Sequence, residues 1–287
     1  MLRRSAIGAF ALSVALLTTI GGAWALDDAK YPDLKGHWER FVVRGLGGQA
    51  SFDQTKPWGL GQQAPLTPEY RAIFEASVAY QAKGGHGNNS TRAQCLPAGM
   101  PNMMIAFRPL EFVVKPDTTY ILIGDQDHYR RIFTDGRDFP KEFEPTYQGY
   151  SIGRWIDEDG DGRYDVLEAE SRGFKGPRVY DATGLPLHYD NQSIFKERIY
   201  LDKADPNTLH DEFTVIDHAL TQPWIVDKKY LRKSDARADW DEFYCTEGNA
   251  QVFIGKENYF MSGDGFLMPA RKDQPPPDLR YFKSSRK

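Results

Sequence analysis

Residues 157–168 have the residue types and spacing of a calcium-binding loop. They read Asp-Glu-Asp-Gly-Asp-Gly-Arg-Tyr-Asp-Val-Leu-Glu, which matches the twelve-residue pattern of alternating oxygen ligands with a glycine at the sharp turn. Ca²⁺ takes about six to eight oxygen ligands, and carboxylates this close together repel one another without a cation. The predicted ligands are side-chain carboxylates and one backbone carbonyl, that of Arg163: Asp157, Asp159, Asp161, Arg163, Asp165 and Glu168.

The same stretch also fits an acidic, glycine-rich hairpin turn. Segments typical of strands flank it, at 148–155 and 164–171. A calcium sensor responds by opening a pair of helices. The flanking strands therefore favour a structural calcium ion that orders a long hairpin.

Three titratable residues are candidates for acid–base catalysis. Glu170 is free of the loop, whereas Glu168 on the same strand face is a predicted ligand, and His188 and Glu197 follow in the chain. One histidine with two carboxylates can transfer protons as general acid and base. The alternative is that these residues, like His210, are solvated or salt-bridged.

Arginines near residue 135 are a candidate site for an anionic ligand. Arg130, Arg131 and Arg137 carry guanidinium groups that match carboxylate or phosphate oxygens. Asp135-Gly136 is equally the turn of a hairpin with its charges in water. The hairpin turn is the favoured interpretation.

Two further patterns have structural explanations. Residues 149–153 read Gly-x-Ser-x-Gly, but a nucleophile elbow requires a turn from strand to helix, and the acidic loop follows here, so Ser151 is not a predicted nucleophile. Met100, Met103 and Met104 suit an adaptable apolar wall, with core packing as the commoner explanation.

The N-terminus predicts export. Arg3 and Arg4 precede an apolar run at 7–20 and a small-x-small cleavage site at 23–25, the pattern of a signal peptide over residues 1–25. An uncleaved membrane anchor is the alternative, but the run is short for a spanning helix of about 20 residues. The mature protein is expected to be periplasmic or secreted, without stable membrane insertion.

Export affects the interpretation of the two cysteines. An oxidising compartment permits a disulfide between Cys95 and Cys245. Neither cysteine has a histidine or a second cysteine at ligand spacing, which argues against a metal pair or a catalytic thiol.

Composition excludes one class of partner. The chain has 36 Lys and Arg against 40 Asp and Glu, a net charge of −4, and it lacks a basic stripe with interleaved aromatic residues. Both features argue against nucleic-acid binding. The 13% of aromatic residues suits a β-rich core or an aromatic-lined pocket.

Hydrophobic spacing predicts one helix and many short strands. Thr67 stands at the N-cap position before Pro68, and apolar residues then recur at helical spacing, which predicts a helix near 68–82. Strands are predicted at 38–44, 104–107, 110–115, 118–125, 129–134, 148–155, 164–171, 192–201, 208–216 and 224–230.

These elements predict a mainly β protein. The fold class is an antiparallel meander, forming either a lipocalin-like barrel or a sandwich, with one N-terminal helix. A single β-rich domain is expected over residues 26–268. Residues 269–287, with three consecutive prolines, are predicted to form a flexible tail.

Several stretches together resemble a broad group of uncharacterised secreted bacterial proteins. They are Cys95-Leu96-Pro97-Ala98-Gly99-Met100-Pro101, Arg130-Arg131-Ile132-Phe133-Thr134-Asp135-Gly136-Arg137, Gly149-Tyr150-Ser151-Ile152-Gly153-Arg154-Trp155, Glu197-Arg198-Ile199-Tyr200-Leu201 and Leu220-Thr221-Gln222-Pro223-Trp224. The resemblance covers roughly residues 65–247 and implies a β-rich fold. The Gly-x-Trp pair at 153–155 is similar to that of lipocalin-like barrels.

Three functions are compatible with this sequence. The preferred hypothesis is an exported, calcium-stabilised protein that holds a small apolar or amphipathic ligand in an aromatic-lined cavity. The second is an enzyme in which Glu170, His188 and Glu197 transfer protons in the barrel. The third is a structural envelope protein without a ligand. The sequence leaves the ligand's identity and the oligomeric state open.

Overall fold

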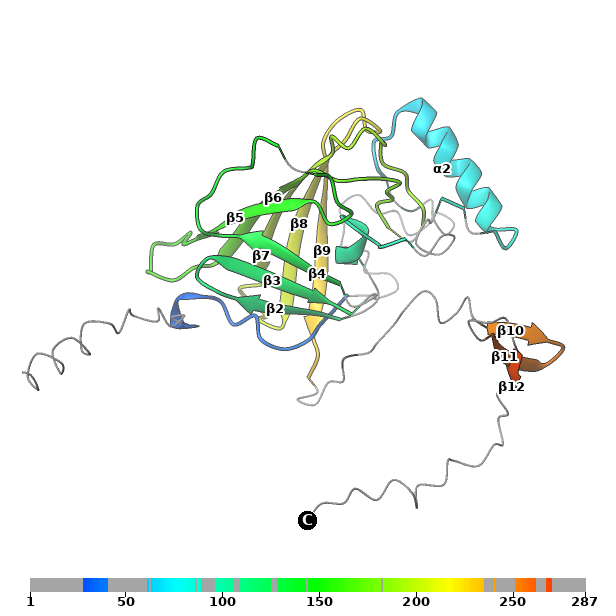
Figure 1. Cartoon of the computed structure of the whole chain (residues 1–287). Coiled ribbons are helices and arrows are strands. Elements are labelled where there is room, and N and C mark those ends of the chain that lie inside the picture. The colour runs from blue at the N-terminus through cyan, green and yellow to red at the C-terminus, as the bar shows by residue number, and fades with distance from the viewer. Residues whose placement is uncertain are drawn as a thin grey trace, which may run out of the picture.

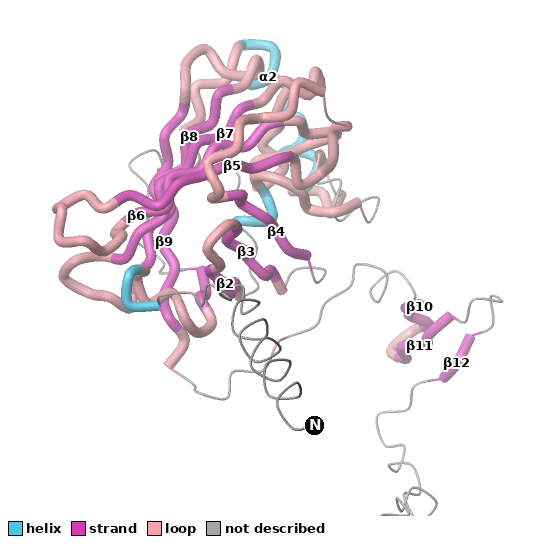
Figure 2. The backbone as a smooth tube through the Cα atoms, turned by 60° about the vertical axis from the view of Figure 1, so that its left-hand side comes forward, coloured by secondary structure: helices cyan, strands magenta, loops and turns pink. Residues whose placement is uncertain are grey.

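Period-two alternation of apolar residues builds nine strands that close into a barrel, seen in the computed structural model (Figures 1 and 2). The structure describes residues 28–40, 61, 63–85, 87–88, 96–105, 109–124, 128–142, 144–181, 183–234, 240, 251–261 and 267–269. The barrel strands are β1 Trp38–Arg40, β2 Leu110–Val114, β3 Thr118–Ile123, β4 His128–Phe133, β5 Tyr150–Ile156, β6 Val166–Arg172, β7 Ile194–Leu201, β8 Thr208–Ile216 and β9 Trp224–Arg232.

The sequence predicted either a barrel or a sandwich, and the structure is a closed barrel. Each strand pairs with the next one in sequence, and β9 pairs with β1 to close the sheet. All pairings are antiparallel except that between β4 and β5, where Ile132 lies opposite Ser151 in parallel register. This one parallel pairing departs from the predicted antiparallel meander, because the link over 134–149 returns the chain to the end of the barrel where β4 began.

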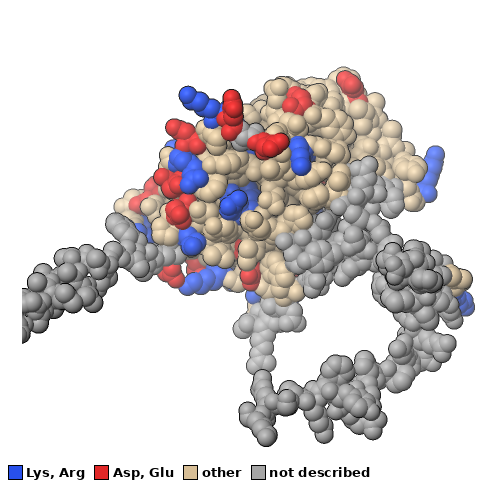
Figure 3. Space-filling model, viewed as in Figure 1, with Lys and Arg blue, Asp and Glu red and all other residues tan. Residues whose placement is uncertain are grey.

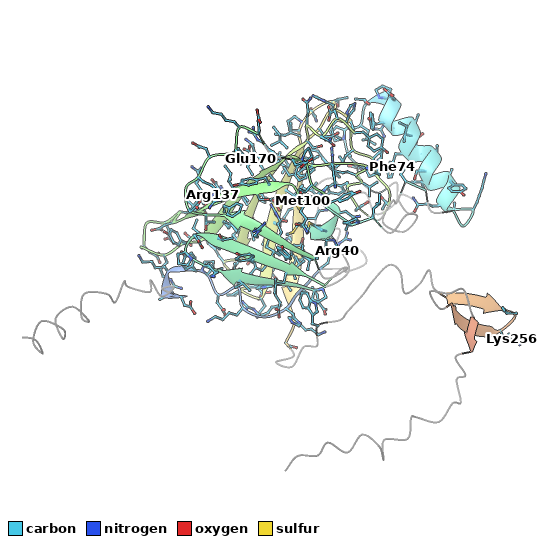
Figure 4. The ribbon with its side chains drawn as sticks, in the orientation of Figure 1. Arg40, Phe74, Met100, Arg137, Glu170 and Lys256 are labelled. Atoms are coloured by element: carbon cyan, nitrogen blue, oxygen red, sulfur yellow. The ribbon has the colours of Figure 1, made fainter. Side chains whose placement is uncertain are left out.

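One α-helix lies among the described residues. α2, Pro68–Gln81, begins as predicted: the Thr67 hydroxyl accepts a hydrogen bond from the Tyr70 amide at 3.4 Å. The Thr67 amide donates to the Ala219 carbonyl at 2.9 Å, which joins the start of α2 to the loop between β8 and β9. Phe74 is buried on the side of α2 that faces the barrel (Figure 4).

The strand predicted at 104–107 is wrong where the structure describes it. A 3₁₀ helix, η2 Asn102–Ile105, occupies the segment. Met103 and Met104 are adjacent and both buried. A strand points neighbouring side chains to opposite faces, whereas a helical turn can bury both. The methionines, with Met100, pack in the core.

Apolar side chains fill much of the barrel interior. The rings of Phe174, Phe195 and Phe213 lie in a row, with centroids 4.7 Å and 5.3 Å apart. Residues between β6 and β7 add further buried side chains, among them Tyr180, whose ring centroid is 4.5 Å from that of Trp224.

One 3₁₀ helix and one small three-stranded sheet complete the described chain. η1, Asp28–Lys30, precedes the barrel, and β10 Gln251–Ile254, β11 Glu257–Met261 and β12 Leu267–Pro269 form a separate antiparallel sheet. β12 therefore crosses the predicted boundary between domain and tail. Within the described residues, no helix has the length and apolarity that a membrane crossing requires.

Candidate functional site in the barrel interior

An ion pair lies in the centre of the barrel. Arg130 on β4 and Glu197 on β7 are 1% and 0% exposed. Arg130 donates to both carboxylate oxygens of Glu197, through Nη1 at 2.7 Å and through Nη2. The Ser171 hydroxyl accepts from Arg130 Nη2 at 2.8 Å, and the Ser151 hydroxyl accepts from Nε at 3.3 Å. These four residues, the Arg130 network, satisfy one another.

Two more ionisable side chains inside the barrel lack such partners. Asp211 on β8 and Lys228 on β9 lie opposite each other in register and are 1% and 3% exposed. Within the described part of the chain, both carboxylate oxygens of Asp211 lack a hydrogen-bond partner, and so does the Nζ of Lys228. Lys228 Nζ lies 4.4 Å from the centroid of the Tyr180 ring, a cation–π distance.

Neighbouring polar groups are also unpartnered. Tyr180 Oη and Trp224 Nε1 are buried and make no hydrogen bond within the described residues. Buried polar groups in proteins almost always have a partner, so a cluster without one requires an explanation. We call Asp211, Lys228, Tyr180 and Trp224 the interior polar cluster.

Burial changes the protonation of this cluster. Burial, followed by the negative charge of Glu197, raises the pKa of Asp211 well above its usual range. Burial, followed by the positive charge of Arg40, lowers the pKa of Lys228 to about 7. Both pKa shifts favour the uncharged forms of the two side chains, which can donate and accept hydrogen bonds without a large net charge.

The sequence contains the signal that would have identified these residues. Asp211 alternates in phase with Leu209, Phe213 and Val215, and all four are buried on one face of β8. Lys228 is likewise in phase with buried Trp224, Val226 and Tyr230 on β9. An ionisable residue in phase with an apolar strand face is predicted to point inward.

The predicted calcium loop joins β5 to β6 in a hairpin. Asp157, Asp159 and Asp165 each offer an oxygen within 4.8 Å of the others. Asp157 also accepts the amides of Gly160 and Gly162 at 2.7 Å and 2.9 Å, which fixes the turn. The structure thus brings together loop positions 1, 3 and 9.

Glu168, the predicted twelfth position, has other partners. It lies in β6 on the outer face of the barrel, where Arg154 and Arg198 donate to it at 2.7 Å and 3.1 Å. Asp161 accepts the Arg163 amide at 2.8 Å and lies outside the group of three aspartates.

The three catalytic candidates lie in different surroundings. Glu170 is on the outer face of β6, paired with Arg172 and Lys196 (Figure 4). His188 is in the loop between β6 and β7, and Glu197 belongs to the Arg130 network. The structure does not bring these three residues together.

A surface pocket of about 490 Å³ lies outside the barrel beside the acidic loop of residues 157–165. His210 lies between Asp227 and Asp202, 3.0 Å and 3.3 Å away, and its ring stacks on Tyr200. Acidic and basic side chains also interleave over the face of the molecule that Figure 3 shows. The pocket-lining residues are Glu158, Arg198, Tyr200, Asp202, Lys203, Ala204, His210 and Glu212. Since the charged groups pair with one another, the pocket does not suit an apolar ligand.

The predicted arginine cluster is divided by the strand. Arg130 points inward and Arg131 outward, whereas Arg137 folds back on Asp135 with an Nε–Oδ1 distance of 2.8 Å. The contact between Arg137 and Asp135 agrees with the predicted hairpin turn. The three guanidinium groups point in different directions, so they do not form one site for an anionic ligand.

The Gly-x-Ser-x-Gly segment runs into β5 rather than a strand-to-helix turn. Ser151 hydrogen-bonds to Ser171 at 2.6 Å. A Cβ added at Gly153 would lie 2.6 Å from the Glu168 carbonyl oxygen on β6 and 2.7 Å from Ile132 Cγ2 on β4, so close packing of both neighbouring strands explains this glycine. Cys95 and Cys245, the predicted disulfide, lie outside the described residues.

No model of a protein family matches this chain, and no curated protein matches it. The resemblance to secreted bacterial proteins stays a prediction.

Proposed function

We propose that the chain is an exported, calcium-stabilised β-barrel protein that binds one small amphipathic ligand inside the barrel. The observation that carries the proposal is that the buried groups of Asp211 and Lys228 have no hydrogen-bond partner within the described residues. A polar group of the ligand would bond to this pair, and its apolar part would contact the aromatic and aliphatic side chains around it.

Energetics favour a binding role for these two residues over a folding role. Burial of a polar or ionisable group without a hydrogen bond destabilises the folded state. Apolar residues of similar volume are often at least as stable as buried charges. Two ionisable residues held in otherwise apolar rows therefore point to a ligand that completes their hydrogen bonds.

The Arg130 network is a contrasting case within the same barrel. Its guanidinium, carboxylate and two hydroxyls are bonded to one another, so it needs no ligand and can serve as a structural crosslink. The buried groups of the interior polar cluster, in contrast, have no hydrogen-bond partner within the described residues.

Protonation indicates the kind of polar group. With the pKa of Asp211 raised and that of Lys228 about 7, the pair suits an uncharged hydroxyl or carbonyl better than a strong anion or cation. The neighbouring rings of Tyr180 and Trp224 suit an apolar body.

Two parts of the proposal rest on other evidence. Export rests on the signal-peptide pattern of residues 1–25. Calcium rests on the loop pattern and on the proximity of Asp157, Asp159 and Asp165. A cation there would stabilise the β5–β6 hairpin, outside the ligand site.

A fluorescence titration with prodan, a neutral naphthalene ketone, tests the proposal. Saturable binding of one prodan per chain is expected, and Lys228→Met should weaken it about tenfold through the lost hydrogen bond. Lys196→Met removes a lysine from the outer face of β7 and should leave binding unchanged. Equal affinity of all three proteins would reject the interior site.

Acid–base catalysis is the second candidate, and the protonation of Asp211 and Lys228 favours it. A carboxyl with a raised pKa and an amine with a pKa of about 7 can exchange protons near neutral pH. Mass spectrometry of ligands recovered from the protein after incubation would distinguish the two functions. A change in ligand mass that Lys228→Met abolishes supports catalysis, and unchanged ligand supports binding. If no molecule binds, the third hypothesis, a structural envelope protein without a ligand, would be favoured.

A further inference from the structure

A second group of side chains, which differs in residue type from the interior polar cluster, has the composition of a transition-metal site. His188, Asp190 and His218 each offer one ligand atom, and these atoms lie within 4.8 Å of one another. An Asp190 oxygen lies 3.2 Å from Nδ1 of His188, and the same oxygen contacts Nδ1 of His218. Two histidines come from different loops, so the tertiary fold brings the group together.

A buried hydrogen-bond network holds the backbone that carries the histidines. Arg178 is buried and donates to the His188 carbonyl at 2.7 Å, while the His188 amide donates to Asp217 at 2.9 Å. Ser193 links Arg178 to Asp217: its hydroxyl accepts a hydrogen bond from Arg178 at 2.6 Å and donates one to Asp217. Asp217 directly precedes His218, so one network positions both loops.

The turn after His188 directs the carboxylate back to the histidine. Asn191 has a φ of 61°, a left-handed conformation that asparagine tolerates better than most residues. Asp190 accepts the Gln192 amide through Oδ1 at 3.1 Å, which leaves Oδ2 toward the histidines. Such fixed geometry is what metal sites require of their supporting residues.

The ligand set selects the class of metal. Imidazole nitrogens suit Zn²⁺ and its first-row neighbours, whereas Ca²⁺ and Mg²⁺ take oxygen ligands. Two histidines and one carboxylate supply three ligands, and in zinc sites the fourth position of such a set is open to water or substrate. His218 is 65% exposed, so the group lies at the surface, where a metal ion can reach it from solvent.

We propose that His188, Asp190 and His218 bind one Zn²⁺ or a similar divalent transition metal, linking the β6–β7 and β8–β9 loops. The ring of Tyr70 on α2 lies 5.5 Å from that of His188, so the bound metal would also stabilise the contact between α2 and these loops. This site is independent of the ligand site in the barrel and of the acidic loop.

Calorimetric titration of the full chain without a histidine tag, with ZnCl₂ in saturating CaCl₂, tests the proposal. Calcium keeps zinc from the acidic loop. One Zn²⁺ per chain should bind, and His188→Gln, His218→Gln and Asp190→Asn should each weaken binding by at least about tenfold. His128→Gln and Asp138→Asn, outside the group, are the matched controls. Co²⁺ should give visible absorption bands that the three site variants lose.

Two results would overturn the proposal. The first is the absence of zinc binding to the wild-type chain. The second is zinc binding that the site variants and the controls affect equally, which would place the metal elsewhere. Circular dichroism of each variant verifies that its fold is unchanged, so that lost binding reports on the ligands.

Discussion

At the residue scale, the chemistry of this protein depends on which face of a strand a side chain occupies. Asp211 and Glu212 are neighbours, but Asp211 is buried inside the barrel and Glu212 accepts the Tyr200 hydroxyl at 2.8 Å on its outer face. Sequence alternation can assign those faces. It could not show that Glu197 meets Arg130, because that contact joins β4 to β7 across the barrel.

Lys228→Met should stabilise the ligand-free protein by roughly 1–3 kcal/mol at neutral pH, because it removes a buried amine that has no hydrogen bond within the described residues. In the wild type, the pKa of Lys228 falls from 10.5 to about 7 on folding. Between these values the unfolded chain holds a proton that the folded chain has lost, so stability rises with pH across this window. The variant should lack this rise.

Urea unfolding at about pH 7 and about pH 10 measures both effects. Lys196→Met on the outer face provides the control for loss of a lysine. A Lys228→Met protein that is less stable than wild type, with the same pH dependence, would mean that Lys228 has a stabilising partner in the barrel.

Arg130→Met should destabilise the protein by about 3–5 kcal/mol, because it leaves Glu197 buried and unpaired. The double variant Arg130→Met, Glu197→Gln should recover part of that loss, since the amide is neutral. Urea unfolding of the two single variants and the double variant measures the coupling. Additive losses would show that Arg130 and Glu197 stabilise the barrel independently.

At the element scale, short strands were predictable because apolar and polar residues alternate between clear turn residues. The strand predicted at 208–216 coincides with β8, and Thr67 caps α2 as expected. The failure at 104–107 has a local cause, since adjacent buried methionines contradict strand alternation. The spacing of acidic residues alone predicted a calcium loop, but it could not show that Glu168 pairs with arginines from β5 and β7.

Calcium should raise the thermal stability of the wild-type protein, by about 2.7 kcal/mol at a concentration a hundredfold above Kd. Asp157→Asn should remove most of this gain, because Asp157 lies in the group of three aspartates. Glu168→Gln should retain it, since Glu168 pairs with two arginines.

Thermal unfolding with CaCl₂ and with a chelator measures each gain. Equal loss in both variants would instead support the complete twelve-residue ligand set. No calcium effect on the wild type would make the loop an acidic turn.

At the scale of the whole molecule, the sequence predicted a β-rich meander but did not distinguish a barrel from a sandwich. Closure depends on β1, a three-residue strand that pairs with β9, and on the parallel contact of β4 with β5. Both are long-range pairings that no local pattern encodes. Closure in turn places the rows of β8 and β9 inside, where Asp211 and Lys228 meet the aromatic core.

The most direct test of the interior ligand site is a double-mutant cycle on prodan binding. Dissociation constants are measured by calorimetry for the wild type, Asp211→Asn, Lys228→Met and the double variant. Each single variant should weaken binding about tenfold, and the double variant should be little weaker than either one, because both residues bond to the same polar group. Unchanged affinity in both single variants would contradict a ligand held by Asp211 and Lys228.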